Sequence, residues 1–407
     1  MGVALPSSRH ARRISAVALC LLLASFAVGG CARKDANAQA SPKSGGSSSG
    51  GHANPSGAAT SASSIHLPVI AESSLLEPPS YAGYEPLPSF TYHHVDSKIA
   101  NDITITPATF EAQLKVLASL GYHTITARQL VDHQQKGTPL PDKPVMITFD
   151  AGWRTQYTHA WPLLQKYGMV ATFFINPQPI SARYPAYMTR DMIVALAKAG
   201  NDIESHTWRH LRLTRSAAQT TASFQQKNVS QLTLANSWIG KVTGRLPVAI
   251  CYPFGYYDLE TIGMARALGF KAGFTVDEEV ADARAWDAFQ MKRFVITRAD
   301  NADTFRTRLL SGPLPVTDIQ PPPGSHNVGT NITVSVNISS IPSTISGVRL
   351  IGGPSVRNIQ VVQRGGQKYL QAVIRGGKTG FRVIAVTGTG ADGRDYSASW
   401  GIEIGDK

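Results

Sequence analysis

Short apolar runs alternate with amphipathic stretches between residues 84 and 310 of this chain. In the first amphipathic stretch, Phe110, Leu114 and Leu117 recur at helical spacing, with Gly121 at its end. Strands are predicted at residues 145–149, 171–175, 202–205, 249–252 and 272–276. Helices are predicted at residues 107–120, 157–167, 192–199 and 259–268. Such a strand–helix repeat predicts an α/β fold with a parallel sheet, either closed into a barrel or left open.

The apolar pattern changes to period two beyond residue 312. Residues 332–338 alternate strictly between apolar and polar, as a half-buried strand does. Further short runs follow at residues 360–362, 369–374, 381–386 and 397–404, separated by glycine-containing turns. We therefore predict a small all-β, immunoglobulin-like sandwich at 313–407, after an α/β domain at 84–312. The sandwich offers no acid/base cluster, so a spacer is the simpler interpretation and carbohydrate binding is the alternative.

Residues 1–31 are typical of an export signal, with basic residues followed by a short apolar stretch. The string Val28-Gly-Gly-Cys31 fits the cleavage site of a bacterial lipoprotein, which predicts lipidation of Cys31 and anchoring to a membrane. An ordinary secreted signal is the alternative. Ala32 after the cysteine favours the outer membrane over the inner one. Residues 32–83 are rich in Ser, Gly, Ala and Pro and predict a flexible tether.

Cysteine usage and charge narrow the range of partners. Cys20 lies in the signal and Cys31 would carry lipid, so no internal disulfide is predicted and Cys251 is interpreted as a buried thiol. The formal net charge of +12 suits a protein beside an anionic envelope. No basic run with interleaved aromatic residues occurs, so we expect no nucleic-acid partner. We expect a monomer.

Two predicted strand ends carry the candidate chemistry. The strand at 145–149 delivers Asp150, and the strand at 202–205 delivers His206 and His210. In parallel α/β folds, functional residues gather where strands end and loops begin. Two histidines in an H-x-x-x-H spacing can bind one metal ion, although this spacing alone is weak evidence.

The ordered set of motifs is more specific than either strand end. Phe90-Thr-Tyr-His-His-Val95 precedes Asp150, and Tyr252-Pro-Phe-Gly255 follows the histidines. From residue 90 to about residue 298, the chain resembles the polysaccharide deacetylases of the NodB-homology type, carbohydrate esterase family 4. The resemblance is greatest to the poly-β-1,6-N-acetylglucosamine deacetylases of bacterial envelopes. It implies a distorted (β/α) barrel and a divalent metal ion, with zinc, cobalt or nickel as the candidates.

The resemblance also implies a role for each matching residue. Asp150 matches the general base of the family, and His93 matches its general acid. His206 and His210 match the two metal-binding histidines. The residues that match the substrate and oxyanion turn are Tyr252, Pro253 and Phe254. In that turn, the backbone N–H of Phe254 is expected to hold the oxyanion.

Two positions depart from the pattern of the family, and for each of them another residue could compensate. Ala151 stands where the family has a second Asp, which is a metal ligand. Glu204 precedes His206 by two residues, so both face one side of a strand and Glu204 is a possible substitute ligand. The usual arginine before the Pro-Phe-Gly string is absent, and Arg293 is a candidate to orient Asp150. A solvent-facing basic residue is the alternative for Arg293.

The leading hypothesis is metal-dependent N-deacetylation of an N-acetylglucosamine polymer of the envelope or the extracellular matrix. A second hypothesis is a catalytically impaired binding or accessory protein, because Ala151 removes a ligand. Hydrolysis of O-acetyl esters needs the same groups and is a third. Trp153 and Trp208 follow the two motifs and either stack on sugar faces or pack against the protein.

Overall fold

The structure is a computed structural model. It describes residues 84–405 apart from 216–218, 285–287, 330, 354–355 and 376–379. The predicted signal at 1–31, the lipidation site Cys31 and the tether at 32–83 lie outside the described residues. Within the described part of the chain, no helix has both the length and the apolar character needed to cross a bilayer.

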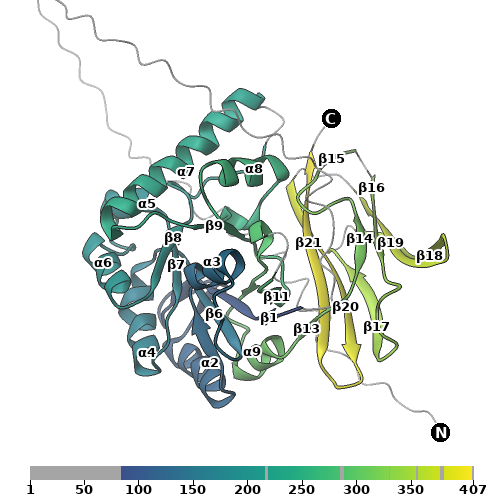
Figure 1. The fold of residues 1–407 in the computed structure, drawn as a ribbon, viewed down its shortest axis with the longest axis horizontal. Coiled ribbons are helices and arrows are strands. Elements are labelled where there is room, and N and C mark those ends of the chain that lie inside the picture. The colour runs from purple at the N-terminus through teal and green to yellow at the C-terminus, as the bar shows by residue number, and fades with distance from the viewer. Residues whose placement is uncertain are drawn as a thin grey trace, which may run out of the picture.

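The first half of the described chain builds a curled sheet of parallel strands with helices packed outside it (Figure 1). In spatial order, its strands are β10 (Ala272–Phe274), β9 (Ala249–Cys251), β8 (Asp202–Ser205), β7 (Thr172–Ile175), β6 (Pro144–Ala151), β2 (Ser89–Tyr92) and β12 (Phe294–Val295), with β5 (His123–Ile125) paired to β6. The paired strands β1 (Pro86–Leu87) and β11 (Ala281–Asp282), and β3 (His94–Val95) and β4 (Thr104–Ile105), lie beside it. All strand pairings within the curled sheet are parallel, as a (β/α) barrel requires.

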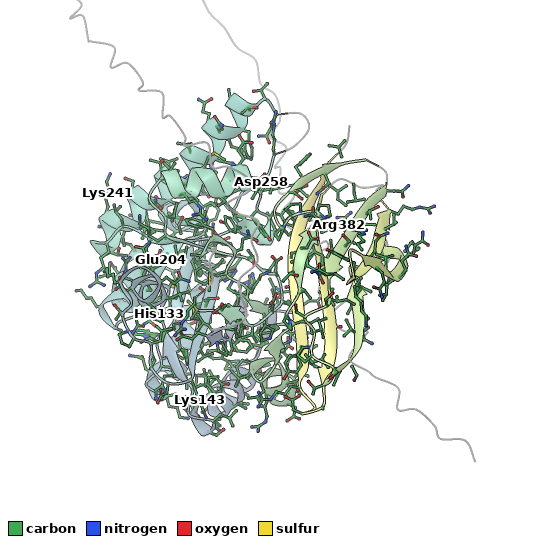
Figure 2. The ribbon with its side chains drawn as sticks, turned by 45° about the vertical axis from the view of Figure 1, so that its right-hand side comes forward. His133, Lys143, Glu204, Lys241, Asp258 and Arg382 are labelled. Atoms are coloured by element: carbon green, nitrogen blue, oxygen red, sulfur yellow. The ribbon has the colours of Figure 1, made fainter. Side chains whose placement is uncertain are left out.

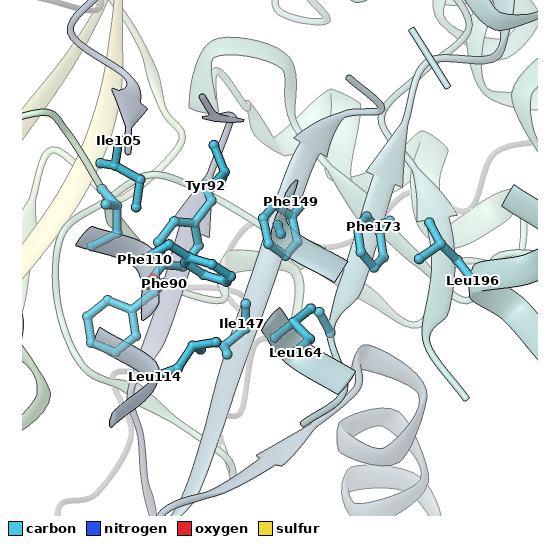
Figure 3. Packing of buried hydrophobic residues seen from close by; sticks show 14 of the residues in the cluster. Phe90, Tyr92, Ile105, Phe110, Leu114, Ile147, Phe149, Leu164, Phe173 and Leu196 are labelled. Atoms are coloured by element: carbon cyan, nitrogen blue, oxygen red, sulfur yellow. The ribbon is translucent and has the colours of Figure 1, made fainter. Parts of the chain in front are cut away.

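The helices are α2 (Pro107–Ser119), α3 (Ala127–Lys136), α4 (Trp161–Lys166), α5 (Pro177–Ser181), α6 (Arg190–Lys198), α7 (Thr221–Thr243), α8 (Leu259–Ala267) and α9 (Ala302–Leu309). The predicted face of α2 is confirmed, since Phe110, Leu114 and Leu117 are all fully buried. They pack under strands β2 and β6 in one apolar cluster, which Figure 3 shows. In the same cluster, Phe149 of β6 stacks on Phe173 of β7 with ring centroids 4.9 Å apart.

The helix predicted at 157–167 is present, but its two halves are of different types. Gln156–Ala160 is a π-helical turn, and the α-helix begins only at Trp161. Pro162 explains the change, because proline has no N–H with which to close an α-helical hydrogen bond to the preceding turn.

Helix α7 is the longest helix described, and the sequence pattern did not predict it. Its buried face mixes apolar Phe224, Leu232 and Ile239 with polar Asn228 and Gln231. The polar members dilute the helical period of the apolar ones, which hides the helix from a pattern based on apolar residues.

The remaining residues form an all-β region of two sheets. One sheet contains β13 (Gly312–Pro313), β21 (Asp395–Gly405), β20 (Gly380–Gly390), β17 (Ile345–Ile351) and β15 (His326–Val328); the other contains β14 (Thr317–Gln320), β16 (Asn331–Asn337), β19 (Gln367–Arg375) and β18 (Val356–Arg364). Apolar side chains from both sheets share one core around the fully buried Trp400. The predicted all-β region is confirmed, and its assignment to the immunoglobulin-like class stays a prediction.

Strand β21 lies along the side of the barrel (Figure 1). Figure 2 shows Asp258, which caps α8, where the barrel meets the all-β region, with Arg382 on the β side of the junction. Asp258 accepts a hydrogen bond from the N–H of Thr261 at 2.7 Å, as the cap of a helix N-terminus does.

Candidate active site

Strand β6 ends in a backbone turn that places Asp150 at the edge of the sheet. Asp150 is 2% exposed, and the next two residues, Ala151 and Gly152, both have left-handed backbones with φ of 76° and 82°. Glycine adopts this conformation readily, whereas alanine does so at a cost. A non-glycine residue held in such a conformation is a common feature of functional sites.

Arg293 binds the Asp150 carboxylate through two parallel hydrogen bonds. Its Nη1 donates to Oδ1 at 2.8 Å and its Nη2 donates to Oδ2 at 2.9 Å. Burial alone would raise the pKa of Asp150, but Arg293 outweighs it and holds that pKa well below its usual range. Arg293 is fully buried, so the solvent-facing alternative for this residue is wrong. The arginine missing from the Pro-Phe-Gly string is therefore replaced from another part of the chain.

Cys251 completes this buried group. The Arg293 Nη2 also donates to its sulfur at 2.9 Å, and its thiol donates to Asp150 Oδ2 at 3.3 Å. Burial raises the pKa of the Cys251 thiol well above its usual value. The prediction of a buried thiol is confirmed, and its position beside the carboxylate was not foreseen.

His206 and His210 lie together, as their spacing predicted. Their ring centroids are 4.7 Å apart. The Nδ1 of His206 is 2.8 Å from the carbonyl oxygen of Cys251, so it carries the proton and leaves Nε2 as the free lone pair. Burial lowers the pKa of His206 to about 3 and that of His210 to about 4, so both rings are neutral near pH 7.

Three polar side chains that the sequence analysis missed hold the loop that carries His206 and His210, which we call the histidine loop. The Nδ2 of Asn176 donates to the carbonyl oxygens of His206 and Thr207. Gln231 of α7 accepts from the N–H of Arg209 at 2.9 Å, and Asn228 of α7 donates to the carbonyl oxygen of Leu213 at 2.6 Å. These contacts support a loop in which Thr207 and His210 both have left-handed backbones. The sequence feature that could have indicated these contacts was the pair of amide side chains, Asn228 and Gln231, on the buried face of α7.

His93 lies between β2 and β3 and is fixed through its backbone. The Nε2 of Gln156 donates to the carbonyl oxygen of His93 at 2.9 Å and to that of Asp150 at 2.7 Å, which ties the two segments together. The His93 Nδ1 is buried and has no hydrogen-bond partner among the described residues. Burial lowers the pKa of His93 to about 4, while the Asp150 charge acts in the opposite direction.

The neighbouring His94 and Trp153 pack against each other at a centroid distance of 4.4 Å. Tyr187 stacks against the same indole at 4.3 Å. Two rings therefore cover Trp153, which favours the packing interpretation over sugar stacking for this side chain.

Glu204 does not reach the histidines, so its interpretation as a substitute ligand is wrong. Its carboxylate accepts from the N–H groups of Val248 and Ala249, both at 2.7 Å, and pairs with Arg128 at 3.2 Å. Period-two alternation places Glu204 and His206 on one side only while the strand continues, and β8 ends at Ser205. The structure thus offers no substitute at this position for the ligand that Ala151 lacks.

The turn after β9 presents backbone rather than side chains. The hydroxyl of Tyr252 donates to the carbonyl oxygen of Phe289 at 3.1 Å, so the Tyr252 ring is directed into the core. Pro253 has no N–H. Phe254 has a left-handed φ of 62°, and within the described residues its N–H has no assigned acceptor. Its ring packs against His210 at 4.4 Å, which joins this turn to the histidine loop.

The donor set fits a divalent cation. Asp150, His206 and Cys251 each offer a ligand atom, and these atoms lie within 4.8 Å of one another. His210 adds a second neutral imidazole against His206. Imidazole, carboxylate and thiolate are ligands of zinc and of its first-row neighbours. Within this group, Asp150 is already paired with Arg293.

Comparisons with known proteins agree with this geometry. The sequence profile of the family named polysaccharide deacetylase matches residues 137–273. The Bacillus subtilis protein YxkH, whose name places it among the polysaccharide deacetylases, is 31% identical over 195 residues, which are 48% of this chain and 66% of that protein. The Staphylococcus aureus poly-β-1,6-N-acetyl-D-glucosamine N-deacetylase is 24% identical over 210 residues, which are 50% of this chain and 71% of that enzyme.

A solved structure supports the fold. The Streptococcus pyogenes deacetylase PplD, in complex with acetate, superposes with a TM-score of 0.51 at 21% identity. The match covers 56% of this chain and 99% of PplD. This chain therefore carries a polysaccharide deacetylase domain of the NodB type, homologous to the staphylococcal N-deacetylase and to other hydrolases of amide bonds.

Proposed function

We propose that this protein is a metal-dependent N-deacetylase that releases acetate from an N-acetylglucosamine polymer. The observation that carries the proposal is the buried Asp150–Arg293 pair, which lies in one group with His206. An ionised carboxylate beside neutral imidazoles is what amide hydrolysis by an activated water requires. The named substrate of the staphylococcal relative supports the choice of polymer.

In the proposed reaction, Asp150 takes a proton from the water whose oxygen attacks the acetamide carbonyl carbon. Arg293 keeps the carboxylate ionised and fixes its orientation. The Phe254 N–H would donate to the oxygen that becomes negatively charged. His93 then gives a proton to the amine nitrogen as the C–N bond breaks. Burial keeps His93 neutral in the free protein, so it would first take up a proton from solvent, which the negative charge of the tetrahedral intermediate would favour.

His206 and His210 would hold the metal ion. A bound divalent cation supplies polarisation of the carbonyl and a lower pKa for water. Zinc, cobalt and nickel all suit two imidazoles with a carboxylate nearby.

We also propose a place for the protein in the cell. Cys31 would carry lipid and the segment 32–83 would tether the folded part to a membrane, with the outer membrane preferred. The substrate would then be a polysaccharide of the envelope or of a biofilm, and the protein would act on it as a monomer.

The all-β region that accompanies the enzyme domain would be immunoglobulin-like.

A second candidate function is polymer binding without turnover. Ala151 supports it, because the carboxylate that the family uses as a ligand is missing and Glu204 is engaged elsewhere. The same residues would act on O-acetyl esters, so the substrate set must include both bonds.

The test is acetate release by the full chain with added zinc, cobalt or nickel. The substrates are β-1,6-linked N-acetylglucosamine oligomers, chitooligosaccharides and an O-acetylated sugar. Metal-dependent release that Asp150→Asn lowers by about 10²–10⁴-fold would support the enzyme. Oligomer binding without acetate release, with activity gained in Ala151→Asp, would favour the second candidate. Release from the ester alone would contradict N-deacetylation.

A further inference from the structure

We propose that strand β21 is a positioning element of the active site, through the residues Ser399, Gly401 and Glu403. Only the expected effect on turnover rests on the proposed function. Alternate residues of a strand point to opposite faces. Ala398, Trp400 and Ile402 of β21 enter the core of the all-β region, whereas the odd-numbered residues between and after them contact the barrel.

The first contact leads to the histidine loop. Glu403 is 1% exposed and pairs with Arg212, which lies two residues after His210. The Arg212 guanidinium also lies over the ring of Tyr256, 5.1 Å from its centroid. Arg212 is thus held between β21 and the turn that follows Phe254.

The second contact leads to the oxyanion turn. The N–H of Gly401 donates to the hydroxyl of Tyr257 at 3.2 Å. Phe381 of β20 packs on Tyr256 and Tyr257 at 5.0 and 5.4 Å, and Tyr256 packs on Phe254 at 5.8 Å. A Cβ at position 401 would collide with the Phe381 ring, so glycine is required for this packing. Phe381 thereby belongs to the same apolar cluster as Tyr252 and Tyr257 of the barrel.

The third contact leads to the arginine that holds Asp150. The carbonyl oxygen of Ser399 accepts from Nζ of Lys292, the residue next to Arg293. The N–H of Ser399 donates to Glu279 at 2.8 Å, and Lys292 also pairs with Glu279 at 3.7 Å. Ser399 is 3% exposed, so this junction is buried.

One strand therefore contacts the neighbours of all three parts of the site: His210, Phe254 and Arg293. Supports outside the ligand set of a metal site typically change metal affinity by about 10–100-fold when removed. A spacer would have no reason to bury polar groups against these three segments. The all-β region is accordingly assigned to holding the site in shape.

The test compares Glu403→Gln and Phe381→Leu with Asp392→Asn in the full chain. Gln keeps the size of Glu403 without its charge, and Leu keeps an apolar side chain at 381 but removes the ring that packs on Tyr256 and Tyr257. Asp392 is an exposed acidic residue of the all-β region. It hydrogen-bonds to Arg394 and Tyr396, which are close to it in the chain, so Asp392→Asn controls for the loss of a charge. The readouts are the ring NMR signals of His206 and His210 without metal, the Co²⁺ affinity and the separate values of kcat and KM.

We expect Glu403→Gln and Phe381→Leu to shift the two histidine signals, weaken Co²⁺ binding about 10-fold and lower kcat more than KM changes. Asp392→Asn should leave all readouts at the parent values. Unchanged histidine signals and Co²⁺ affinity in both test variants would overturn the proposal. If the histidine signals shift in variants of a parent that releases no acetate, the positioning role stands and the proposed enzyme function fails.

Discussion

The two halves of the candidate site differ in how many of their polar atoms have a hydrogen-bond partner within the protein. In the carboxylate half, Asp150 and Arg293 meet through two hydrogen bonds, with Cys251 filling the remaining contact. In the imidazole half, His206 is buried, His210 is partly buried, both rings are neutral, and the Nδ1 of His93 has no partner among the described residues. The first half is complete without a ligand, whereas the second has nitrogen lone pairs available.

Because of this difference, we expect the carboxylate half to matter mainly for folding stability and the imidazole half mainly for metal binding. A buried, paired charge is costly to disturb, so the carboxylate half should dominate the response of folding to mutation. Neutral nitrogens kept out of water are ready to bind a cation, so the imidazole half should dominate the response to metal.

The largest effect is expected from Arg293→Met, which leaves the Asp150 carboxylate buried without its partner. The free energy of unfolding should fall by about 3–5 kcal/mol, measured by urea denaturation. Adding Asp150→Asn to the same chain should recover part of that loss, because the buried charge is removed. A double variant no more stable than the single one would contradict the pairing.

Ala151→Asp should strengthen the imidazole half. The backbone at 151 is left-handed, a conformation that Asp tolerates better than most residues do. We expect Co²⁺ affinity to rise by about 10–100-fold, measured by titration calorimetry. Ala151→Asn is the matched control, since it has the same shape without the charge and should raise affinity less. Equal affinity in both variants would argue against a carboxylate ligand at this position.

Acid should destabilise the protein through its buried histidines. His206 has a pKa of about 3 in the folded chain against 6.5 as its ordinary value. Between these values the unfolded chain binds a proton that the folded chain does not, so stability falls as pH is lowered through this window. In His206→Asn, the fall between pH 6.5 and 4 should be shallower by about 1–3 kcal/mol in urea denaturation. Glu279, with its pKa raised by burial to about 7, acts in the opposite direction in both proteins, so only their difference is diagnostic. Parallel curves would refute the assignment.

The smallest effect on the site is expected from Glu204→Gln. Its carboxylate serves the backbone of Val248 and Ala249 and the side chain of Arg128, away from the histidines. Unfolding free energy should fall by about 1–3 kcal/mol while Co²⁺ affinity is unchanged. A clear loss of metal binding in this variant would restore Glu204 as a ligand candidate.

Much of the fold followed from the sequence because apolar periods report burial directly. The strands that carry Asp150 and lead into His206 lie where the runs at 145–149 and 202–205 predicted them, as β6 and β8. The contact between His206 and His210 likewise followed from a four-residue spacing at a strand end.

The features that the sequence analysis missed or misassigned have separate physical causes. Arg293, the residue before β12, lies 143 residues from Asp150 in the chain, and only the curled sheet brings β12 beside β2 and so within one strand of β6. Helix α7 was hidden because Asn228 and Gln231 occupy buried positions that a pattern of apolar residues treats as exposed. Glu204 was misassigned because the strand ends one residue before His206.

Because alternate residues of β21 face the all-β core and the barrel, we expect the barrel and the all-β region to unfold as one cooperative unit. A strand of this kind cannot leave one core without disrupting the other, so local opening at either side should propagate across the junction. Thermal denaturation of the described part of the chain should then show a single transition, and hydrogen exchange at Trp400 and at Tyr252 should report similar opening free energies.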